Sequence, residues 1–217
     1  MVKKTCAILQ PHYLPWLGYF EMMDSVDVFV FLDDVQFIKR EWKNRNRIRK
    51  THNHKDGKWL SVPIMRCDQK SLMCEARLAQ ESDWVSIHLN SIKGTYSHAP
   101  YFSVFFPLLE YWFYNAKKET LSELNISLLI ELSSMLGIQT EFLRSSELNV
   151  FEKKEYKLLG ICKKIGASKL IANNASTSYV NAGFFNNSQI NFLTQDYEHP
   201  MYPQVSGNEK LSPLLYL

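Results

Sequence analysis

The sequence predicts an α/β fold with a parallel sheet, and three local patterns near its start support this prediction. Residues 5–9 form a short apolar run, residues 16–24 can form a helix, and residues 26–32 form a β-branched and aromatic run. A strand, a loop, a helix and a second strand within about 30 residues are typical of a parallel βαβ unit. The second run is apolar at consecutive positions, which indicates a strand buried on both faces.

The remaining elements alternate in type, as expected for the same class. A helix is predicted over 120–136 because its leucines recur at helical spacing, and Gly137 follows as the usual C-terminal residue. We expect one domain over 1–217, with a helical middle sub-domain at about 83–136. The other predicted helices cover 83–97, 101–115 and 153–165, and the other predicted strands cover 59–63, 169–172 and 190–193.

Composition indicates a globular protein. Of the 217 residues, 46% are hydrophobic and 22% are charged. The four cysteines form no CxxC pair and have no zinc-site spacing, so we expect reduced thiols and no metal site. The first apolar run is interrupted by Gln10-Pro11-His12, and no run approaches the ~20 residues of a transmembrane helix. We therefore expect a cytoplasmic protein without a signal peptide or a membrane span.

The loop after the first strand is the strongest candidate site. Pro11 and Pro15 stiffen it, and it presents Gln10, His12 and Tyr13 near the start of a helix. Rigid loops with polar tips on a folded scaffold are frequent functional sites, and a helix N-terminus suits an anion. The alternative is a tight turn with packed aromatic side chains.

Asp33 and Asp34 follow the second predicted strand. Ligands of parallel sheets bind at the carboxyl ends of the strands, so we expect these acids to converge with the loop at residues 10–12. Adjacent residues of an extended chain point to opposite sides, which argues against a carboxylate pair that shares one proton. One acid could hold a metal, orient His12 or accept a proton from an attacking amine. Alternatively, one caps the next turn and the other pairs with an arginine.

A basic segment follows the two acids. Between Lys39 and Lys58 the chain has nine basic and two acidic residues, although the whole chain has a net charge of only +3. In an extended segment Asn44, Asn46 and Ile48 share one face, and Arg45, Arg47 and Arg49 share the other. Arginines on one face offer forked donors to phosphate oxygens, and Trp42 could stack on a base or a sugar. A solvated charged strand and a nucleic-acid contact are the alternatives.

Other features carry less information. His52, His54, His88 and His98 lack metal-ligand spacing, and we expect them at the surface or in loops. The aromatic helix at 101–114 is expected in the core or at a dimer face. The segment 199–204 is stiffened by prolines and could close over the first loop or form an ordered tail. No phosphate-binding glycine loop or nucleophile elbow is present.

The chain resembles the WbqC-like family of bacterial proteins, and the resemblance extends over most of its length. The motifs that carry it are Gln10-Pro11-x-Tyr13-x-Pro15-Trp16-x-Gly18-Tyr19-Phe20, Leu32-Asp33-Asp34-Val35-Gln36-Phe37, Trp42-x-Asn44-Arg45-Asn46-Arg47-Ile48, Trp59-Leu60-x-Val62-Pro63, Tyr96-x-x-Ala99-Pro100-Tyr101-Phe102, Ile161-Cys162-Lys163-x-Ile165-Gly166-Ala167 and Tyr202-Pro203-Gln204. The start is also loosely similar to nucleotidyl-transferase folds, which is a likeness of fold alone.

The resemblance implies a role in O-antigen (lipopolysaccharide) biosynthesis. It implies aminoacyl transfer, with glycine as the expected group, to the amine of a nucleotide-linked amino-deoxysugar such as dTDP-4-amino-4,6-dideoxyhexose. ATP with Mg²⁺, or an aminoacyl-tRNA, would activate the carboxylate. The expected catalytic residues are His12, Asp33 and Asp34. The expected substrate-binding residues are Gln10, Tyr13, Trp16, Trp42, Asn44, Arg45, Arg47, Tyr179, Tyr202 and Gln204.

Two departures from the family pattern and two alternatives bear on this expectation. Relatives usually have a glycine-containing turn before the position of Tyr179, where this chain has Asn173-Asn174-Ala175-Ser176. They tend to end in a helix with an aspartate, whereas residues 211–217 contain no acid. The chain could instead be a non-catalytic sugar-nucleotide binding protein. It could also assist a glycosyltransferase at the membrane surface through its aromatic helix, and a homodimer is possible.

Overall fold

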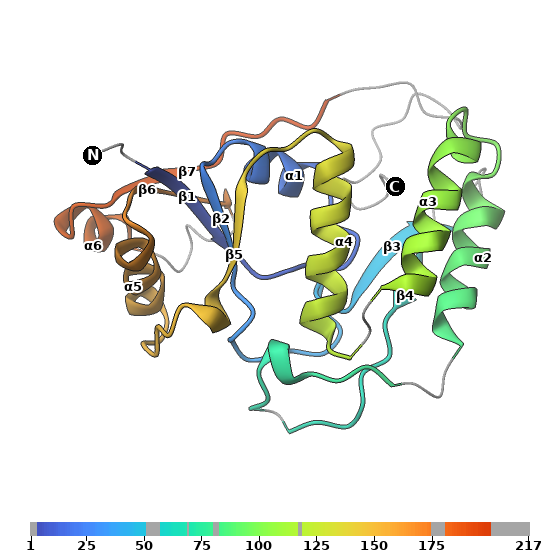
Figure 1. Ribbon diagram of the computed structural model, residues 1–217, viewed down its shortest axis with the longest axis horizontal. Helices are drawn as coiled ribbons and strands as arrows, with labels where there is room; N and C mark the ends of the chain where they lie inside the picture. Colours follow the sequence, from blue (N-terminus) through green and yellow to red (C-terminus); the bar gives the residue numbers. More distant parts are fainter. Residues whose placement is uncertain are drawn as a thin grey trace. The chain divides into compact units, whose positions relative to one another are not determined.

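The computed structural model describes residues 4–50, 57–68, 70–79, 83–116, 119–174 and 181–200 (Figure 1). The chain divides into two compact units, each assembled from segments that are distant in the sequence. We call residues 1–11, 18–35 and 130–198 the sheet unit. We call residues 12–17, 36–129 and 199–217 the hairpin unit.

A parallel sheet is the centre of the sheet unit. Its described strands are arranged in the order β5-β2-β1-β6-β7, and every neighbouring pair is parallel. Since β1 is central and the chain builds outward from it on both sides, this is a doubly wound arrangement. The predicted α/β class with a parallel sheet is therefore confirmed. The strands are β1 (Lys4–Leu9), β2 (Val28–Phe31), β5 (Glu141–Arg144), β6 (Ala167–Ala172) and β7 (Asn191–Thr194).

Helices connect the parallel strands and cover the sheet. Helix α1 (Leu17–Asp24) connects β1 to β2, and α5 (Glu155–Ile165) precedes β6. They lie on opposite sides of the sheet (Figure 1). Gly166 ends α5 in the left-handed region at φ 71°, as a C-terminal glycine should. Helix α6 (Ala182–Asn187) connects β6 to β7.

Side chains of the central strands and of α5 form the core of the sheet unit. All four residues of β2 are buried, which confirms the prediction of a strand covered on both faces. Cys6 of β1 and Cys162 of α5 are both fully buried, with their sulfur atoms 3.7 Å apart as free thiols. The other members of this core are Val28, Val30, Val150, Leu159, Ile161, Ala167, Leu170, Phe185 and Ile190.

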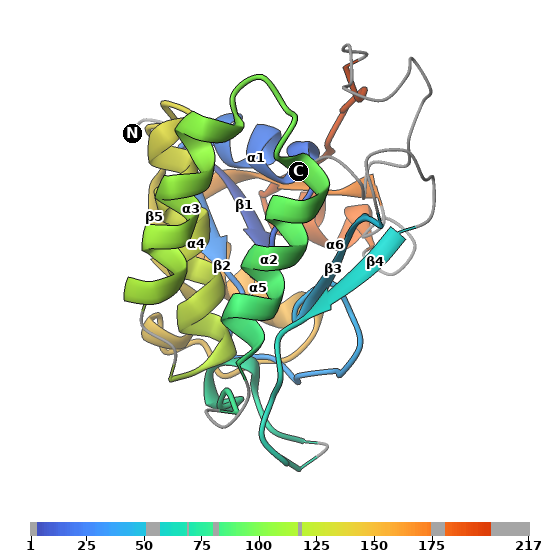
Figure 2. The same cartoon turned by 90° about the vertical axis from the view of Figure 1, so that its right-hand side faces the viewer.

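The hairpin unit consists of an antiparallel strand pair and helices. Strand β3 (Arg45–Arg49) pairs with β4 (Gly57–Ser61), so that Arg47 is opposite Trp59 (Figure 2). Helices α2 (Trp84–Tyr96) and α3 (Phe102–Asn115) pack beside each other. Helix α4 (Leu121–Met135) begins in this unit and ends in the sheet unit. Short 3₁₀ turns occupy Met73–Glu75 here and Ser145–Glu147 in the sheet unit.

The sequence located most of these elements, with three exceptions. β5 and α6 were not predicted, and β3 was expected as an extended arm rather than as a paired strand. The helices expected over 83–136 are present as α2, α3 and α4. That they fold as a sub-domain of one domain stays a prediction. No helix in the described part of the chain combines the length and the apolar character that a membrane crossing requires.

Candidate functional site

Alternation along β3 separates the asparagines from the arginines, as the sequence predicts. Asn44 and Asn46 are buried, whereas Arg45 and Arg47 are partly exposed on the other side. The expectation that Arg49 shares the exposed face of Arg45 and Arg47 was wrong: Arg49 is buried, because its backbone bonds the hydroxyls of Thr95 and Tyr96 in α2. The two partly exposed arginines are therefore the ones available to a ligand.

Trp59 holds these two arginines in place, and the sequence reasoning did not assign it to the site. The Cζ atom of Arg45 lies 4.0 Å from the centre of the Trp59 ring, and that of Arg47 lies 5.5 Å from it. Trp42 packs on the same tryptophan, with ring centroids 5.4 Å apart. Trp42 was expected to stack on a ligand, but its observed ring partner is Trp59. The signal for Trp59 was available, because pairing of β3 with the predicted strand at 59–63 places a tryptophan opposite an arginine.

The arginine side chains have unused hydrogen-bonding capacity. The Nε atoms of Arg45 and Arg47 are buried and have no hydrogen-bond partner among the residues that the structure describes. A buried donor without a partner costs about 1–3 kcal/mol, and more when it is charged. An acceptor supplied by a ligand would remove that cost. Phosphate and carboxylate oxygens are the acceptors that match a guanidinium group best.

Gly57 makes room for one of the two arginines. A Cβ atom at this position would lie 2.5 Å from Nε of Arg47, which is closer than real Cβ atoms approach. The absence of a side chain at residue 57 therefore permits the position of Arg47 beside Trp59. We call Trp42, Arg45, Arg47, Gly57 and Trp59 the arginine–tryptophan cluster.

Asn46 anchors the proline-rich loop, residues 10–16. The amide of Asn46 donates to the backbone carbonyls of Tyr13 and Leu14, and its oxygen accepts from the backbone N–H of Arg47 at 2.6 Å. Leu14 has φ 47°, a left-handed conformation that costs a non-glycine residue about 1–2 kcal/mol. Asn44 donates to the carbonyl of Val62 at 3.2 Å. Both asparagine amides therefore bond the protein backbone rather than face solvent.

Tyr13 connects the loop to helix α2. Its hydroxyl is 2.7 Å from Nδ1 of His88, and both side chains are buried. Burial raises the pKa of Tyr13 well above its usual value, so the hydroxyl stays protonated and donates to Nδ1. Burial also lowers the pKa of His88 to about 4. A hydrogen bond with the backbone of Ser61 raises this pKa in part, and repulsion from the positive charge of Lys58 lowers it further. The expectation that His88 lies at the surface or in a loop was wrong, since helical spacing places it on the inner face of α2.

His12 is neutral near physiological pH. Burial, with a smaller contribution from the positive charge of Lys43, lowers its pKa to about 3. Burial lowers the pKa of Lys43 as well. A neutral imidazole offers one N–H donor and one acceptor nitrogen. An anion bound beside these two side chains would raise both pKa values, because it favours the charged forms.

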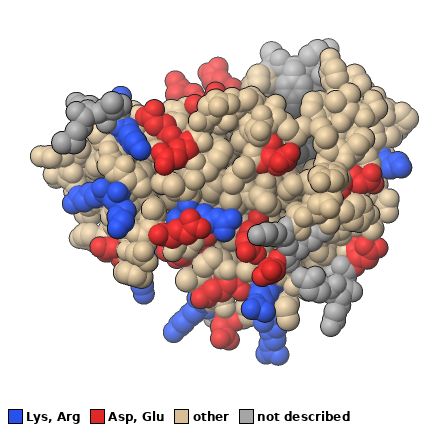
Figure 3. Space-filling view, in the orientation of Figure 1, with Lys and Arg blue, Asp and Glu red and all other residues tan. Residues whose placement is uncertain are grey.

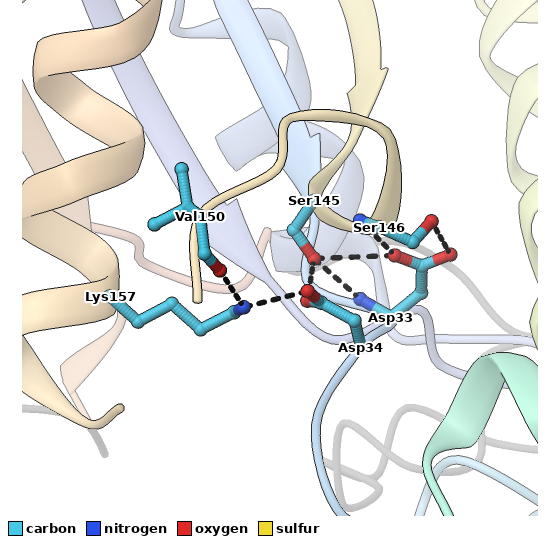
Figure 4. Close-up of polar contacts among 6 residues, drawn as sticks. All are labelled: Asp33, Asp34, Ser145, Ser146, Val150 and Lys157. Atoms are coloured by element: carbon cyan, nitrogen blue, oxygen red, sulfur yellow. Dashed lines mark hydrogen bonds and ion pairs between the residues drawn. The ribbon is translucent and has the colours of Figure 1, made fainter. Parts of the chain in front are cut away.

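Asp33 and Asp34 belong to a second polar cluster, in the sheet unit (Figure 4). The Ser145 hydroxyl lies 3.2 Å from Oδ1 of Asp33 and also contacts Oδ1 of Asp34. Asp33 further accepts from the backbone N–H and the hydroxyl of Ser146, at 3.0 and 2.9 Å. The expectation that the two carboxylates point apart was therefore wrong, because the chain turns after β2 and both reach Ser145.

Lys157 is the last member of this cluster, and we call Asp33, Asp34, Ser145, Ser146 and Lys157 the carboxylate cluster. Its Nζ atom donates to Oδ2 of Asp34 at 2.6 Å and to the carbonyl of Val150 at 2.7 Å. The side chains of Lys157 and Asp34 are only 9% and 18% exposed. The sequence left open that one acid pairs with an arginine; Asp34 does pair with a basic side chain, but that side chain is Lys157. The predicted role of Asp34 as a proton acceptor stays a prediction.

The remaining predicted residues lie elsewhere. Gln10 follows β1, and its backbone carbonyl accepts from the Tyr19 hydroxyl at 2.9 Å. Trp16 is partly buried at the end of the proline-rich loop. In the described part of the chain no group of three or more His, Cys, Asp and Glu side chains could hold a metal ion. Tyr179, Tyr202 and Gln204 lie outside the described residues.

The fold and these clusters define an α/β protein that combines a doubly wound parallel sheet with a basic, tryptophan-backed hairpin. The chain belongs to the WbqC-like protein family, whose model matches residues 10–213. It is 30% identical over 205 residues to the uncharacterized protein Rv1507c of Mycobacterium tuberculosis, covering 94% of this chain and 87% of that protein. No solved structure matches the chain.

Proposed function

We propose that this protein binds a nucleotide-linked amino-deoxysugar and transfers an aminoacyl group, with glycine as the expected group, to the amine of that sugar. The observation that carries the proposal is the pair of buried, unpartnered Nε donors of Arg45 and Arg47. The diphosphate of a sugar nucleotide supplies acceptor oxygens of the geometry that two guanidinium groups prefer. Membership of the WbqC-like family supports a place in surface-polysaccharide (O-antigen) biosynthesis.

The transfer requires an activated acyl group, because a carboxylate and an amine do not condense unaided. The sugar amine attacks the carbonyl carbon of an aminoacyl adenylate or an aminoacyl-tRNA ester. An amide bond forms, the bond to the leaving oxygen breaks, AMP or tRNA departs, and the amine loses a proton. If ATP is the activator, the amino-acid carboxylate attacks its α-phosphorus and pyrophosphate leaves, which gives the aminoacyl adenylate; Mg²⁺ would enter bound to the ATP phosphates, with no protein ligand assigned to it.

In this proposal the two parts of the hairpin unit have different roles. Arg45 and Arg47 bind the phosphates, and Trp59 keeps their guanidinium groups oriented. His12, neutral and beside Lys43, donates a hydrogen bond to an anionic oxygen or accepts the amine proton. Asn46 holds the loop that carries His12, which is a positioning role.

A non-catalytic sugar-nucleotide binding protein is the second candidate function. The engagement of both Asp33 and Asp34 by serine and lysine side chains favours it, because it commits the carboxylates expected to take part in the chemistry. The two candidates share the ligand and differ in turnover. One experiment can therefore separate them.

The experiment combines calorimetry with product analysis. Binding of dTDP-4-amino-4,6-dideoxyhexose is measured first, and the protein is then incubated with this sugar, ATP, Mg²⁺ and glycine, with and without glycyl-tRNA. Arg45→Gln should weaken binding by roughly 10- to 100-fold, the equivalent of one lost charge-assisted hydrogen bond of about 1.5–3 kcal/mol. Arg40→Gln removes the same charge from an exposed position of the same segment and is the matched control.

Each outcome has a distinct meaning. A product heavier by one glycyl group supports aminoacyl transfer, and the component whose omission abolishes it identifies the activator. Tight binding without product supports the binding protein. If wild-type protein does not bind the sugar nucleotide, or if Arg45→Gln and Arg40→Gln bind alike, the ligand assignment fails.

A further inference from the structure

Helix α3 exposes an apolar surface that the proposed function does not use. Its exposed members recur three or four residues apart along most of the helix, so they share one side of it. Four of them are aromatic rings: Tyr101, Phe105, Tyr111 and Tyr114 are 70%, 53%, 70% and 58% exposed. Val104 and Leu108 lie among them. We call these six residues the aromatic face; in the region of α3, Figure 3 shows mostly uncharged surface with isolated charged side chains.

The opposite side of α3 is already packed. Phe106 and Phe113, seven residues apart, are buried there, and Phe113 contacts Trp84 of α2 at a ring separation of 5.9 Å. Trp112 lies at the edge of the aromatic face, beside Phe105 and Leu108, and is buried as well. The helix is therefore apolar on both sides, and Glu110 is its one charged residue. A helix that is apolar all round is normally buried on every side. Single exposed apolar residues need no explanation, but a contiguous stripe of this kind marks an interaction site.

The area of the aromatic face is close to what a dimer needs. A fully buried Tyr or Phe removes ~150–250 Å² from water, so the four rings at their exposed fractions offer roughly 400–600 Å². A standard interface buries ~800 Å² on each partner, and homodimer interfaces are about 65% apolar, which requires roughly 500 Å² of apolar surface. One copy of α3 therefore supplies about the apolar area that one side of a stable homodimer contributes.

The charge of the helix favours a second protein chain over a lipid surface. Helices that lie on membranes usually carry Lys or Arg on their polar face, and these bind anionic lipids. α3 contains no Lys or Arg, and anionic headgroups would repel Glu110. The three tyrosines combine an apolar ring with a hydroxyl at its edge, a combination that is enriched at protein interfaces.

We infer that the aromatic face of α3 is the site at which a second copy of this chain docks, in a two-fold dimer with α3 against α3. In such a dimer the same residues contribute from both sides, so each substitution acts twice. The inference is independent of the proposed function, because none of the six residues belongs to the arginine–tryptophan cluster or the carboxylate cluster.

Sedimentation equilibrium of the full chain over a micromolar range tests the inference. Wild-type protein should be a dimer, and the double variant Phe105→Glu, Leu108→Glu should raise the dissociation constant by at least about 100-fold. Phe151→Glu places the same charge on a residue that is 85% exposed in the sheet unit, and it should remain dimeric. Matching far-UV circular dichroism of the three proteins establishes that the variants fold.

Three results would overturn the inference. The first is a wild-type chain that stays monomeric even at concentrations 100-fold above those of the sedimentation experiment. The second is a double variant that is folded and still dimeric. A monomeric wild type that co-sediments with phosphatidylglycerol vesicles, and loses this binding in the double variant, would assign the aromatic face to membranes instead.

Discussion

Breaking the ion pair between Asp34 and Lys157 on one side should destabilise the sheet unit strongly. Asp34→Asn keeps the shape of the side chain but removes its charge. It leaves the Lys157 ammonium, 9% exposed, hydrogen-bonded to the carbonyl of Val150 without its anionic partner. Breaking a buried pair by neutralising one partner costs about 3–5 kcal/mol, because the other charge stays buried without compensation. Asp34 is 18% exposed, so we expect a loss near the lower end, at about 3 kcal/mol.

A double-mutant cycle isolates this interaction from the rest of the cluster. Lys157→Met in the Asp34→Asn background removes the uncompensated charge, so the double variant should be more stable than Asp34→Asn alone. The coupling free energy should exceed about 1 kcal/mol, as is usual for contacting residues. The control is Lys4→Met, which breaks an exposed pair with Glu141 at 3.4 Å and should change stability by less than about 1 kcal/mol.

The assay must report on the sheet unit. All five tryptophans lie in the hairpin unit, so their fluorescence does not report directly on the sheet unit. Hydrogen exchange of the β2 and β5 amides follows the sheet unit. We expect Asp34→Asn to lower the free energy of opening of these amides. Additive effects in the cycle would refute the reasoning. Unchanged protection together with lost turnover would make Asp34 a catalytic rather than a structural residue.

Three further predictions concern the hairpin unit. The folded-state pKa of His88, about 4, lies below its unfolded value of 6.5, so the unfolded state binds more protons between these values. The contribution of neutral His88 to the free energy of unfolding is therefore fully present above pH 6.5 and is lost as the pH falls toward 4, by up to ~1.4 kcal/mol per pH unit. In His88→Gln, the slope of the tryptophan-monitored free energy of unfolding against pH should decrease by about one proton. Tyr13→Phe removes the donor to buried Nδ1 and should lower the urea-derived free energy of unfolding by about 1–3 kcal/mol; no change would mean that the hydroxyl contributes nothing. Gly57→Ala should displace the flexible guanidinium of Arg47 and weaken sugar-nucleotide binding by calorimetry as much as Arg47→Gln, whereas equal affinity to wild type would show that this position of Arg47 is not used.

Much of the fold could be predicted because its signals are local. The apolar run at 26–32 and the leucine spacing at 120–136 each determine an element from neighbouring residues. β5 is different, since it is four residues long, half exposed and Glu-Phe-Leu-Arg in sequence. It forms a strand because the edge of β2 offers backbone partners from Val28 to Phe31, which is a tertiary cause. Missing β5 also meant missing Ser145, which directly follows it and contacts both acids.

The candidate site could be predicted in part for the same reason. Period-two alternation is a property of the segment itself, so the separation of Asn44 and Asn46 from Arg45 and Arg47 follows from the sequence. What each face contacts depends on the partner strand and on α2. Trp59 was not assigned to the site and His88 was misplaced, because an antiparallel register and a buried tyrosine–histidine contact are non-local.

The alternation of β3 also couples two features that sequence reasoning treats separately. Asn46 faces inward and fixes the carbonyls of Tyr13 and Leu14, and its oxygen accepts from the N–H of Arg47, the next residue along. Arg47 faces the other way and packs over Trp59. The backbone that is held by the proline-rich loop on one side is thus the same backbone that carries a partly exposed arginine on the other. We therefore expect any change that releases Leu14 from its left-handed conformation to act on Arg47 through Asn46.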